Sequence, residues 1–209
     1  MNRLAEATAY YKVYDANSNE YYGITSLELP QLTKTTTDIK GSGILGTISA
    51  PIEFALDSMT ATLNFRVIEN NMISFLAPGK KSFVLVLLTQ ETDVSTLAPA
   101  YRGWRILLEG KSKSAQLGSI ESGESSNSSC ELEVYHLKVL ENGQEVIDIN
   151  KLGGIYRIGG VDYMQAINAG LESGTNVDLT AIAGATNQVL NQLQTGSNGT
   201  SLQLIVNGL

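Results

Sequence analysis

Two residues have side chains that commonly serve as a base or a nucleophile, because the chain contains one histidine, His136, and one cysteine, Cys130. A catalytic histidine needs a partner group within reach, and no recognisable motif supplies one. We therefore expect His136 to be a strand histidine at a surface or subunit contact. Cys130 adjoins Glu131 and Glu133, whose negative charges disfavour a thiolate. The sequence thus predicts a structural thiol, no catalytic residue and no enzymatic activity.

The remaining chemical candidates are a glycine-rich segment and two carboxylate pairs. The segment GSGILG at residues 41–46 lacks the Lys-Ser/Thr ending and the strand-to-helix context of a phosphate-binding loop. Its glycines more simply permit a backbone path that other residues resist, or the close approach of a neighbouring chain. Glu131 with Glu133, and Glu145 with Asp148, would serve glycoside hydrolysis only across a cleft. Charges on a strand surface are the simpler explanation.

Composition excludes several classes of function. The chain has 209 residues, enough to bury a core without disulfide or metal staples. One cysteine and one histidine provide neither a disulfide framework nor an ordinary zinc site, so we expect no metal and no cofactor. The 14 Lys+Arg against 21 Asp+Glu give a net charge of −7, which disfavours a nucleic-acid reader.

Neither a membrane span nor a secretion signal is visible. A span requires about 18 apolar residues in succession, whereas the longest apolar run, Phe83 to Leu88, is far shorter. The opening residues MNRLAEATAYY contain no apolar core of a signal peptide. We therefore expect no membrane anchor and an intracellular site of synthesis.

Periodicity predicts a mainly β protein. Residues 10–30 suggest an opening hairpin around the turn cluster DANSN, and residues 59–68 alternate cleanly between apolar and polar. Residues 70–80 suggest a short helix closed by a Pro-Gly pair. Residues 82–90 are apolar on both faces of a strand, which indicates cover on both sides. Another strand is expected at 102–110.

The second half of the chain carries stronger local signals. Residues 119–129 are polar and serine-rich, as in a loop or a polar edge, and residues 130–140 change their apolar face midway, which suggests a bulge or a second layer. Asn142-Gly143 predicts a tight hairpin turn. Asp162, followed three residues later by Gln165, predicts the start of a short helix.

Two segments stand apart from this pattern. Residues 29–51 have many threonines and glycines but few apolar residues, and long segments without structure of their own are usually functional. We interpret them as a long interaction loop. Residues 171–209 combine a helical pattern, the breaker TGSNGT and a last strand-like run. The expected division is a domain at 1–170 and a C-terminal helix-strand extension at 171–209.

Several segments in fixed order resemble the major tail tube proteins of contractile-tailed phages and phage-tail-like bacteriocins. The resemblance spans about residues 10–170. Its specific parts are LPQLTKTTTDIKGSGILG (29–46), FRVIENNMISFLAPGKK (65–81), RGWRILLEGKSKSAQLGSIESGE (102–124) and ELEVYHLKVLENGQEVIDINKLGGIYRIGGVDYMQAI (131–167).

The resemblance implies a β-sandwich or partly closed β-barrel with a flanking helix. Six copies would form a ring, their inner strands would join in one continuous barrel around the lumen, and rings would stack into a tube. The long loop would reach an adjacent subunit or ring. Carried over residue by residue, the interface candidates are Leu29, Pro30, Leu32, Gly41, Gly43, Ile44, Leu45 and Gly46.

The same resemblance implies a structural role and a set of partners. These are further copies of the chain, a tail sheath protein, baseplate or initiator and terminator proteins, and a tape-measure protein in the lumen. An acidic lumen would let DNA pass without sequence-specific binding. The particle would be a virion tail or a tailocin assembled in the bacterial cytoplasm. Two alternatives stay open: the tube of a type VI-like secretion machine, and a monomeric β-sandwich that binds carbohydrate through some of its nine tyrosines.

Overall fold

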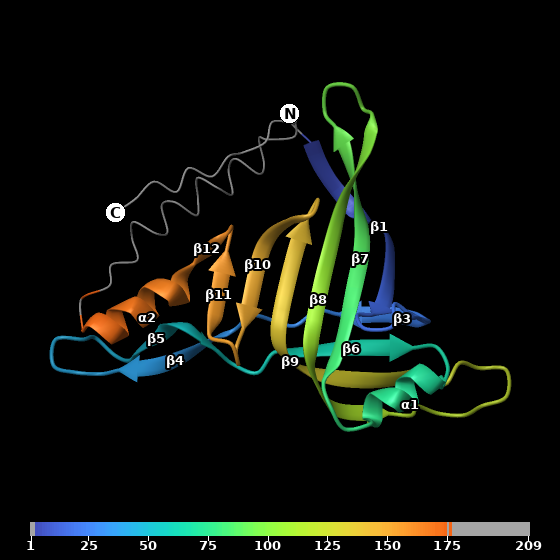
Figure 1. Cartoon of the computed structure of the whole chain (residues 1–209), viewed down its shortest axis with the longest axis horizontal. Coiled ribbons are helices and arrows are strands. Elements are labelled where there is room, and N and C mark those ends of the chain that lie inside the picture. Colours follow the sequence, from blue (N-terminus) through green and yellow to red (C-terminus); the bar gives the residue numbers. More distant parts are fainter. Residues whose placement is uncertain (1–2, 175, 177–209) are drawn as a thin grey trace.

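A computed structural model describes residues 3–174 and residue 176, and these residues are mainly β (Figure 1). They form a ten-stranded sheet, a separate two-stranded sheet, and the helices α1 (Asn70–Leu76) and α2 (Tyr163–Ser173). The large sheet comprises β1 (Arg3–Asp15), β2 (Tyr21–Tyr22), β3 (Ile24–Glu28), β6 (Thr60–Phe65), β7 (Lys81–Asp93), β8 (Pro99–Gln116), β9 (Ser128–Glu141), β10 (Gln144–Asn150), β11 (Ile155–Ile158) and β12 (Val161–Asp162). The small sheet pairs β4 (Lys34–Ile39) with β5 (Ile48–Leu56).

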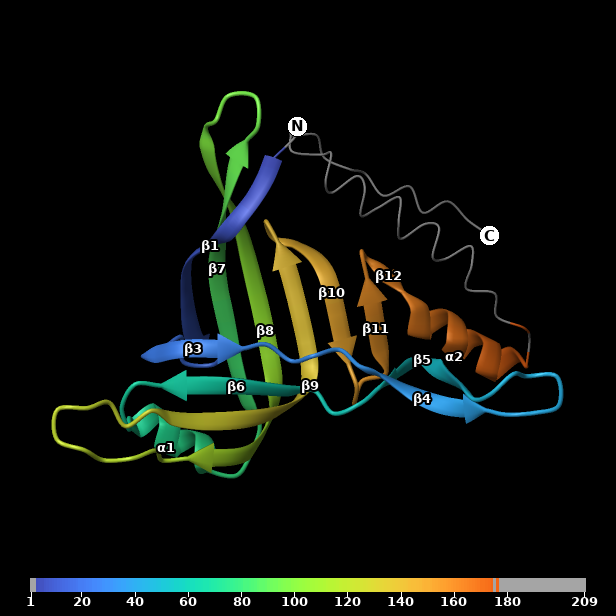
Figure 2. The same ribbon diagram turned by 180° about the vertical axis from the view of Figure 1, so that it is seen from behind.

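The main path of the large sheet runs β12-β11-β10-β9-β8-β7-β1-β2, and all neighbours are antiparallel. The long strands β7, β8 and β9 form its centre, and the β7–β8 turn rises beyond the upper ends of β9 and β10 (Figure 1). Figure 2, seen from behind, shows β3 and β6 running across the lower part of β7 and β8.

The sheet forks along one edge of β9. The first half of β9 pairs with β6, with Thr60 opposite Glu133, and the second half pairs with β10, with Asn150 opposite His136. On its other edge, β9 pairs with β8 along nearly its whole length. The ribbon of β8 and β9 therefore bends and belongs to two layers.

The bend coincides with a bulge at Tyr135. Glu109 pairs with His136 and the next residue, Gly110, pairs with Val134, so that Tyr135 has no partner on β8. The extra residue changes which face of β9 points inward. The bulge expected from the change of apolar face within residues 130–140 is confirmed.

The hydrophobic core fills the angle between the two layers. Helix α1 closes it with Met72 and Phe75, and the Phe75 ring lies 6.2 Å from that of Phe83. Fully buried side chains of β6 and β9 alternate along the strands, as the sequence pattern predicts. The largest buried side chains of this core include Met59, Leu63, Phe65, Phe83, Leu108, Leu132, Val134 and Ile149.

Several local predictions are confirmed. Strand β1 turns into β2 around residues 16–20, and Asn142 (φ 49°) with Gly143 (φ 83°) forms the tight turn between β9 and β10. The Asp162 carboxylate accepts hydrogen bonds from the amides of Met164 (3.1 Å) and Gln165 (3.4 Å) at the start of α2. The expected helix at 70–80 is α1, which ends before the Pro-Gly pair.

Other expectations need correction. The second layer covers only the first half of β7, so residues 82–85 are buried, whereas Val86 and Leu88 are each 38% exposed. The alternating strand at 59–68 ends at Phe65. The expected sandwich or partly closed barrel takes the form of a bent, forked sheet, and no closed barrel exists within residues 3–174.

The expected C-terminal extension lies almost wholly outside the described residues. Helix α2 continues to Ser173, past the expected boundary at residue 170, and ends at Gly174 with φ 66°. The helix-strand pattern of 177–209 falls outside the part of the chain that the structure describes.

Candidate assembly surfaces

The expected interaction loop is a β-hairpin, which we call the arm (residues 29–56). Strands β4 and β5 pair only with each other among the described strands, with Ile39 opposite Ile48. The arm extends sideways beside α2 (Figure 1). The prediction of an unstructured loop was wrong because a threonine-rich chain satisfies its backbone groups in a two-stranded ladder even when it buries few side chains. Most of its residues are exposed, as an interaction segment requires.

The structure divides the eight predicted interface residues between two places. Those at the base of the arm lie between β3 and β4, and those at its tip lie between β4 and β5. The base holds Leu29, Pro30 and Leu32, and the tip holds Gly41, Gly43, Ile44, Leu45 and Gly46. Leu45 is fully exposed, whereas Pro30 and Ile44 are half-buried. The two groups present separate surfaces.

The glycines of the arm tip serve its backbone path. Gly43 (φ 94°) and Gly46 (φ 103°) adopt conformations that residues with a Cβ atom rarely adopt. A Cβ atom on Gly41, Gly43 or Gly46 would meet no other atom within 4 Å. These two φ angles agree with the first of the two roles expected for the glycines.

Phe54 anchors the arm to the body of the molecule. Its ring lies 4.9 Å from that of Tyr156 and 5.6 Å from that of Tyr163. Its φ of 62° is rare for an aromatic residue, so tertiary packing holds the backbone there against a local preference. Nearby, Lys151 Nζ donates to the Asp57 carbonyl oxygen (2.6 Å). The base of the arm is therefore fixed, while its tip is free of such contacts in the described residues.

A cavity of about 210 Å³ lies beside this anchor. It is bounded by the base of the arm, the β10–β11 turn and the first turn of α2. Its lining is mostly apolar and consists of Phe54, Leu56, Ile149, Asn150, Lys151, Gly154, Ile155, Tyr156 and Met164.

The sheet offers backbone groups for pairing at both lateral edges. Residues 3–12 of β1 pair with β7 on one side and with no described strand on the other. At the opposite edge, β12 covers only Arg157 and Ile158 of β11. Residues 3–8 of β1 are exposed on both faces. Strand edges of this kind are templates for pairing with another chain.

The β7–β8 turn is a rigid, apolar tip. The Asp93 carboxylate accepts hydrogen bonds from the Ser95 hydroxyl (2.5 Å), the Ser95 amide (2.9 Å) and the Thr96 amide (3.1 Å). These bonds, the Ser95 hydroxyl foremost, lower the pKa of Asp93 to about 2. Leu97 donates its amide to the Asp93 carbonyl oxygen (2.8 Å) and has φ 56°. Its side chain is 76% exposed.

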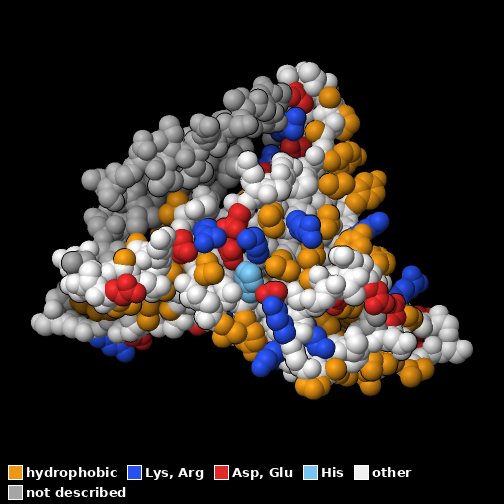
Figure 3. Space-filling model, in the orientation of Figure 1, with side chains coloured by type: hydrophobic (Ala, Val, Ile, Leu, Met, Phe, Trp, Pro, Cys, Tyr) orange, Lys and Arg blue, Asp and Glu red, His pale blue; other side chains and the backbone are white. Residues whose placement is uncertain are grey.

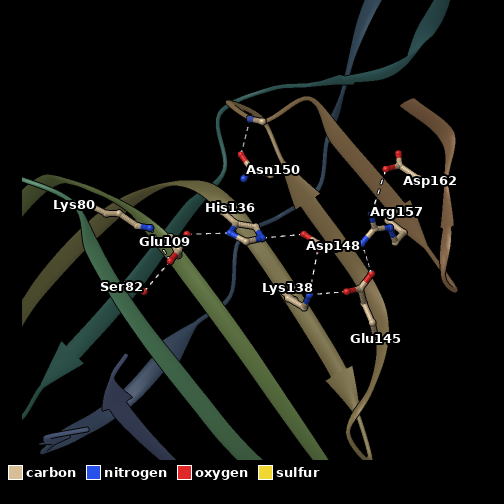
Figure 4. Close-up of polar contacts among 11 residues, drawn as sticks. Lys80, Ser82, Glu109, His136, Lys138, Glu145, Asp148, Asn150, Arg157 and Asp162 are labelled. Atoms are coloured by element: carbon tan, nitrogen blue, oxygen red, sulfur yellow. Dashed lines mark hydrogen bonds and ion pairs between the residues drawn. The ribbon is translucent and has the colours of Figure 1, made fainter. Parts of the chain in front are cut away.

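A continuous network of ion pairs crosses the face of the sheet opposite the core (Figure 4). Lys80 pairs with Glu109 (2.8 Å), and His136 lies between Glu109 (Nδ1 to Oε2, 3.0 Å) and Asp148 (Nε2 to Oδ1, 2.9 Å). The network continues through Lys138, Glu145, Arg157 and Asp162. In Figure 3 acidic and basic side chains alternate around the histidine.

Hydrogen bonding stabilises the charged forms within this network. Burial raises the pKa of Glu109, but hydrogen bonds from Lys80 and His136 outweigh it, and the pKa is lowered. Burial likewise opposes the net lowering of the pKa of Glu145 by Lys138 and Arg157. The hydrogen bond to Glu145 is the largest cause of the raised pKa of Lys138. Each carboxylate is thus matched by cations, which suits a structural surface.

The residues considered above for catalysis lie in the core, on the strand surface or in the ion-pair network. Cys130 is fully buried in β9, and burial raises the pKa of its thiol to about 11, as expected for a structural thiol. Glu131 accepts a hydrogen bond from Ser114, and Glu133 accepts one from Ser58, on the strand surface. His136 belongs to the network, where its two nitrogens face carboxylates.

Sequence reasoning missed the network, the open edge of β1 and the β7–β8 tip. The predicted Asn142-Gly143 turn gave only part of the signal for the network, because a bulge between Glu145 and Ile147 shifts the register by one residue and so places Lys138 opposite Asp148. The pairing of β1 with β7 had no such local signal.

Residues 3–174 contain no group of three or more His, Cys, Asp or Glu side chains arranged to hold a metal ion. Neither described helix is long and apolar enough to cross a membrane.

Comparison with known proteins identifies the family. Residues 6–171 match the family described as phage tail tube protein FII. The chain is 22% identical over 162 residues to the tail tube protein of Escherichia phage P2, covering 71% of this chain and 87% of that protein.

Two solved structures are also similar. One is the sheath/tube terminator of the extracellular contractile injection system PVC in its extended state (14% identity, TM-score 0.45, 66% of this chain and 97% of that one). The other is the PVC sheath-tube complex in the extended state (13% identity, TM-score 0.41, 62% and 87%). Because the family match spans the described domain from β1 almost to the end of α2, the chain belongs to the phage tail tube protein FII family.

Proposed function

We propose that the chain is the structural subunit of the inner tube of a contractile phage tail or phage-tail-like particle. Six copies form a ring, and rings stack into a hollow tube that sheath contraction drives into the target cell. The observation that carries this proposal is the family match over residues 6–171. A tube subunit requires no catalysis.

The open edges of the sheet support lateral association. Strand β1 of one copy can pair with the partly covered β11 edge of its neighbour, and repetition around a ring satisfies both edges. Closure of this kind yields the continuous barrel that the family resemblance implies. It also gives residues 3–8 of β1, exposed on both faces, a role in assembly.

The arm is proposed as a further contact between copies. Leu29, Pro30 and Leu32 at its base and Gly41, Gly43, Ile44, Leu45 and Gly46 at its tip form two surfaces for adjacent subunits or rings. The fully exposed Leu45 supports this role, since burial of an apolar side chain favours association.

The proposed partners follow from the tube. They are a sheath protein outside, a tape-measure protein in the lumen, and baseplate, initiator and terminator proteins at the ends. DNA passes without specific binding in a phage, and the net charge of −7 supports weak attraction for phosphate. The complete particle is a virion tail or a tailocin assembled in the bacterial cytoplasm. Residues 171–209, of which 171–173 complete α2, decorate the outside of the tube or contact the sheath or the next ring.

Negative-stain electron microscopy of the purified full chain at rising concentration tests the proposal. Rings with six subunits, or hollow tubes, are the expected result. A protein that stays monomeric even with baseplate components, and that binds glycans, would instead be the monomeric carbohydrate-binding module. Neighbouring genes for a secretion ATPase rather than for a capsid would identify a type VI-like machine.

A charge on the open edge tests lateral pairing. Leu4 lies on β1 and is 61% exposed, so Leu4→Lys leaves the monomer folded but opposes pairing with another strand. We expect ring formation to fail in Leu4→Lys and to persist in the neutral, β-prone control Leu4→Thr. Normal rings from both variants would refute pairing at this edge.

Truncation tests the extension. A chain ending at residue 174 is expected to form tubes that recruit less sheath protein or stack poorly. Unchanged tube assembly and sheath recruitment would remove this role for residues 171–209.

A further inference from the structure

Two apolar residues of the described chain have backbone conformations that their side chains disfavour. Five residues other than glycine have positive φ, and three of them are asparagines, which tolerate it. The other two are Phe54 (φ 62°), in the wall of the cavity, and Leu97 (φ 56°), at the β7–β8 tip. Strained residues of this kind concentrate where a structure holds a ligand or partner.

The side chain of Leu97 is 76% exposed, so it gains little burial within one copy. The five hydrogen bonds that tie Asp93 to residues 95–98 fix the turn, so the exposed leucine is presented on a rigid support. Val94, on the same turn, is also more than half exposed. Exposed apolar groups on a preorganised tip are typical of an interface, because little ordering is needed on binding.

The cavity has the size and lining to receive such a tip. An apolar cavity of about 150 Å³ admits a molecule as large as benzene, so 210 Å³ has room for a leucine side chain. Its aromatic wall of Phe54 and Tyr156 is preformed by ring contacts.

The β7–β8 turn and the β10–β11 turn, which borders the cavity, lie at opposite ends of the strands (Figure 1). Asn150, which lines the cavity, is level with His136, Glu109 and Ser82 in successive strand pairs. From Ser82 to Asp93, at the tip, β7 runs eleven residues, or roughly 37 Å. In the proposed tube, copies stack head to tail, so the tip of one copy can reach the cavity of a copy in the next ring. Such a heterologous contact propagates a filament.

We propose that the β7–β8 tip of each copy inserts Leu97, flanked by Val94, into the Phe54 cavity of a copy in the next ring. The inference rests on the proposed tube function. The tip lies at the end of β7 and β8, whereas the cavity lies beside β10 and β11, on the other side of β9 in the sheet. A copy whose tip enters the cavity of the next copy is therefore displaced sideways across the sheet as well as along the strands. The contact thus favours a helical stack.

Paired cysteines test which residue occupies the cavity. The full chain carrying Leu97→Cys and Met164→Cys is assembled and treated with a short bismaleimide, while Cys130 is buried and remains as an internal control. We expect a ladder of covalent multimers on a denaturing gel, and none from either single variant. Tubes without this ladder would overturn the proposal, and a ladder from Leu45→Cys with Met164→Cys would assign the cavity to the arm tip.

Substitution of Leu97 separates stacking from ring formation. Leu97→Asn removes the apolar side chain and relieves the backbone strain, so we expect a stable monomer and intact rings. The concentration needed for tubes should rise roughly 10- to 100-fold. Leu97→Met keeps apolar bulk and should assemble as the parent does. Unchanged tubes from Leu97→Asn would overturn the contact, as would rings of the parent that never stack. Absence of parental rings even with baseplate components would refute the tube function itself.

Discussion

The carbonyl oxygen of Glu133 occupies the space that a Cβ atom on Gly110 would fill. Gly110 pairs with Val134, the residue after Glu133, where β8 and β9 pass the bulge at Tyr135, so the bend of both strands depends on this close approach of two backbones. Gly110→Ala must push β8 away from β9. We expect a loss of about 3 kcal/mol in the free energy of unfolding, measured by urea denaturation.

Gly103 on the same strand is the matched control for that substitution. A Cβ atom there would meet its nearest neighbours at 3.8 Å, an ordinary contact. Gly103→Ala should change the free energy of unfolding by less than about 1 kcal/mol. Equal effects of the two substitutions would show that the bulge does not need a glycine.

Asp148 is expected to be the most sensitive carboxylate of the ion-pair network. It is buried and contacts His136, Lys138 and Arg157. Asp148→Asn removes the charge these groups share, and because both cations are partly exposed we expect a loss of about 1–3 kcal/mol. Thermal unfolding of Asp38→Asn, which alters an exposed arm residue hydrogen-bonded to Ser49, provides the control and should shift little.

Acid should destabilise the protein through carboxylates whose pKa is lowered in the folded state. For such groups the stabilisation is present above the unfolded pKa and is lost as the pH falls through the folded pKa. Glu109 and Glu145 therefore begin to lose it below pH 4.5, and Asp93, with a folded pKa of about 2, loses it between pH 3.8 and 2. Asp93→Asn should flatten the lower part of a plot of Tm against pH, and parallel curves would contradict this assignment.

The Cys130 thiol should not react with thiol reagents in the folded protein. It is fully buried, and its pKa of about 11 leaves little thiolate at pH 8. A chromogenic thiol reagent should react only after denaturant is added, with one equivalent per chain. Rapid reaction of the native protein would indicate local opening of β9.

Amide exchange should distinguish the arm from the core. Residues 34–39 and 48–52 lie in a two-stranded ladder with mostly exposed side chains, and isolated hairpins are only marginally stable. We expect fast exchange there in the monomer, slow exchange in β7–β9, and new protection of the arm in tubes. Equal protection of the arm in both states would count against its role as a contact.

Features encoded by neighbouring residues could be predicted from the sequence. Asn142-Gly143 specified a turn, Asp162 specified the start of α2, and the change of apolar face after Val134 located the bulge. Each depends on backbone preferences or side-chain alternation within a few residues.

Features that depend on distant pairing could not be predicted. Nothing near Tyr10 indicates that it pairs with Leu88, and the fork of β9 depends on β6, which lies more than sixty residues earlier. The positive φ of Phe54 contradicts its local preference and arises only from packing against Tyr156 and Tyr163. The sequence set the arm apart from the rest of the chain but did not predict its hairpin, and its role in assembly stays a prediction.

The fork of the sheet has a mechanical consequence. Because β8 and β9 run without a break through both layers, neither layer can turn against the other without distorting covalent backbone. A push on the β7–β8 turn loads many ladder hydrogen bonds at once in shear, rather than peeling them apart one by one. The subunit should therefore resist compression along its long strands as one rigid unit.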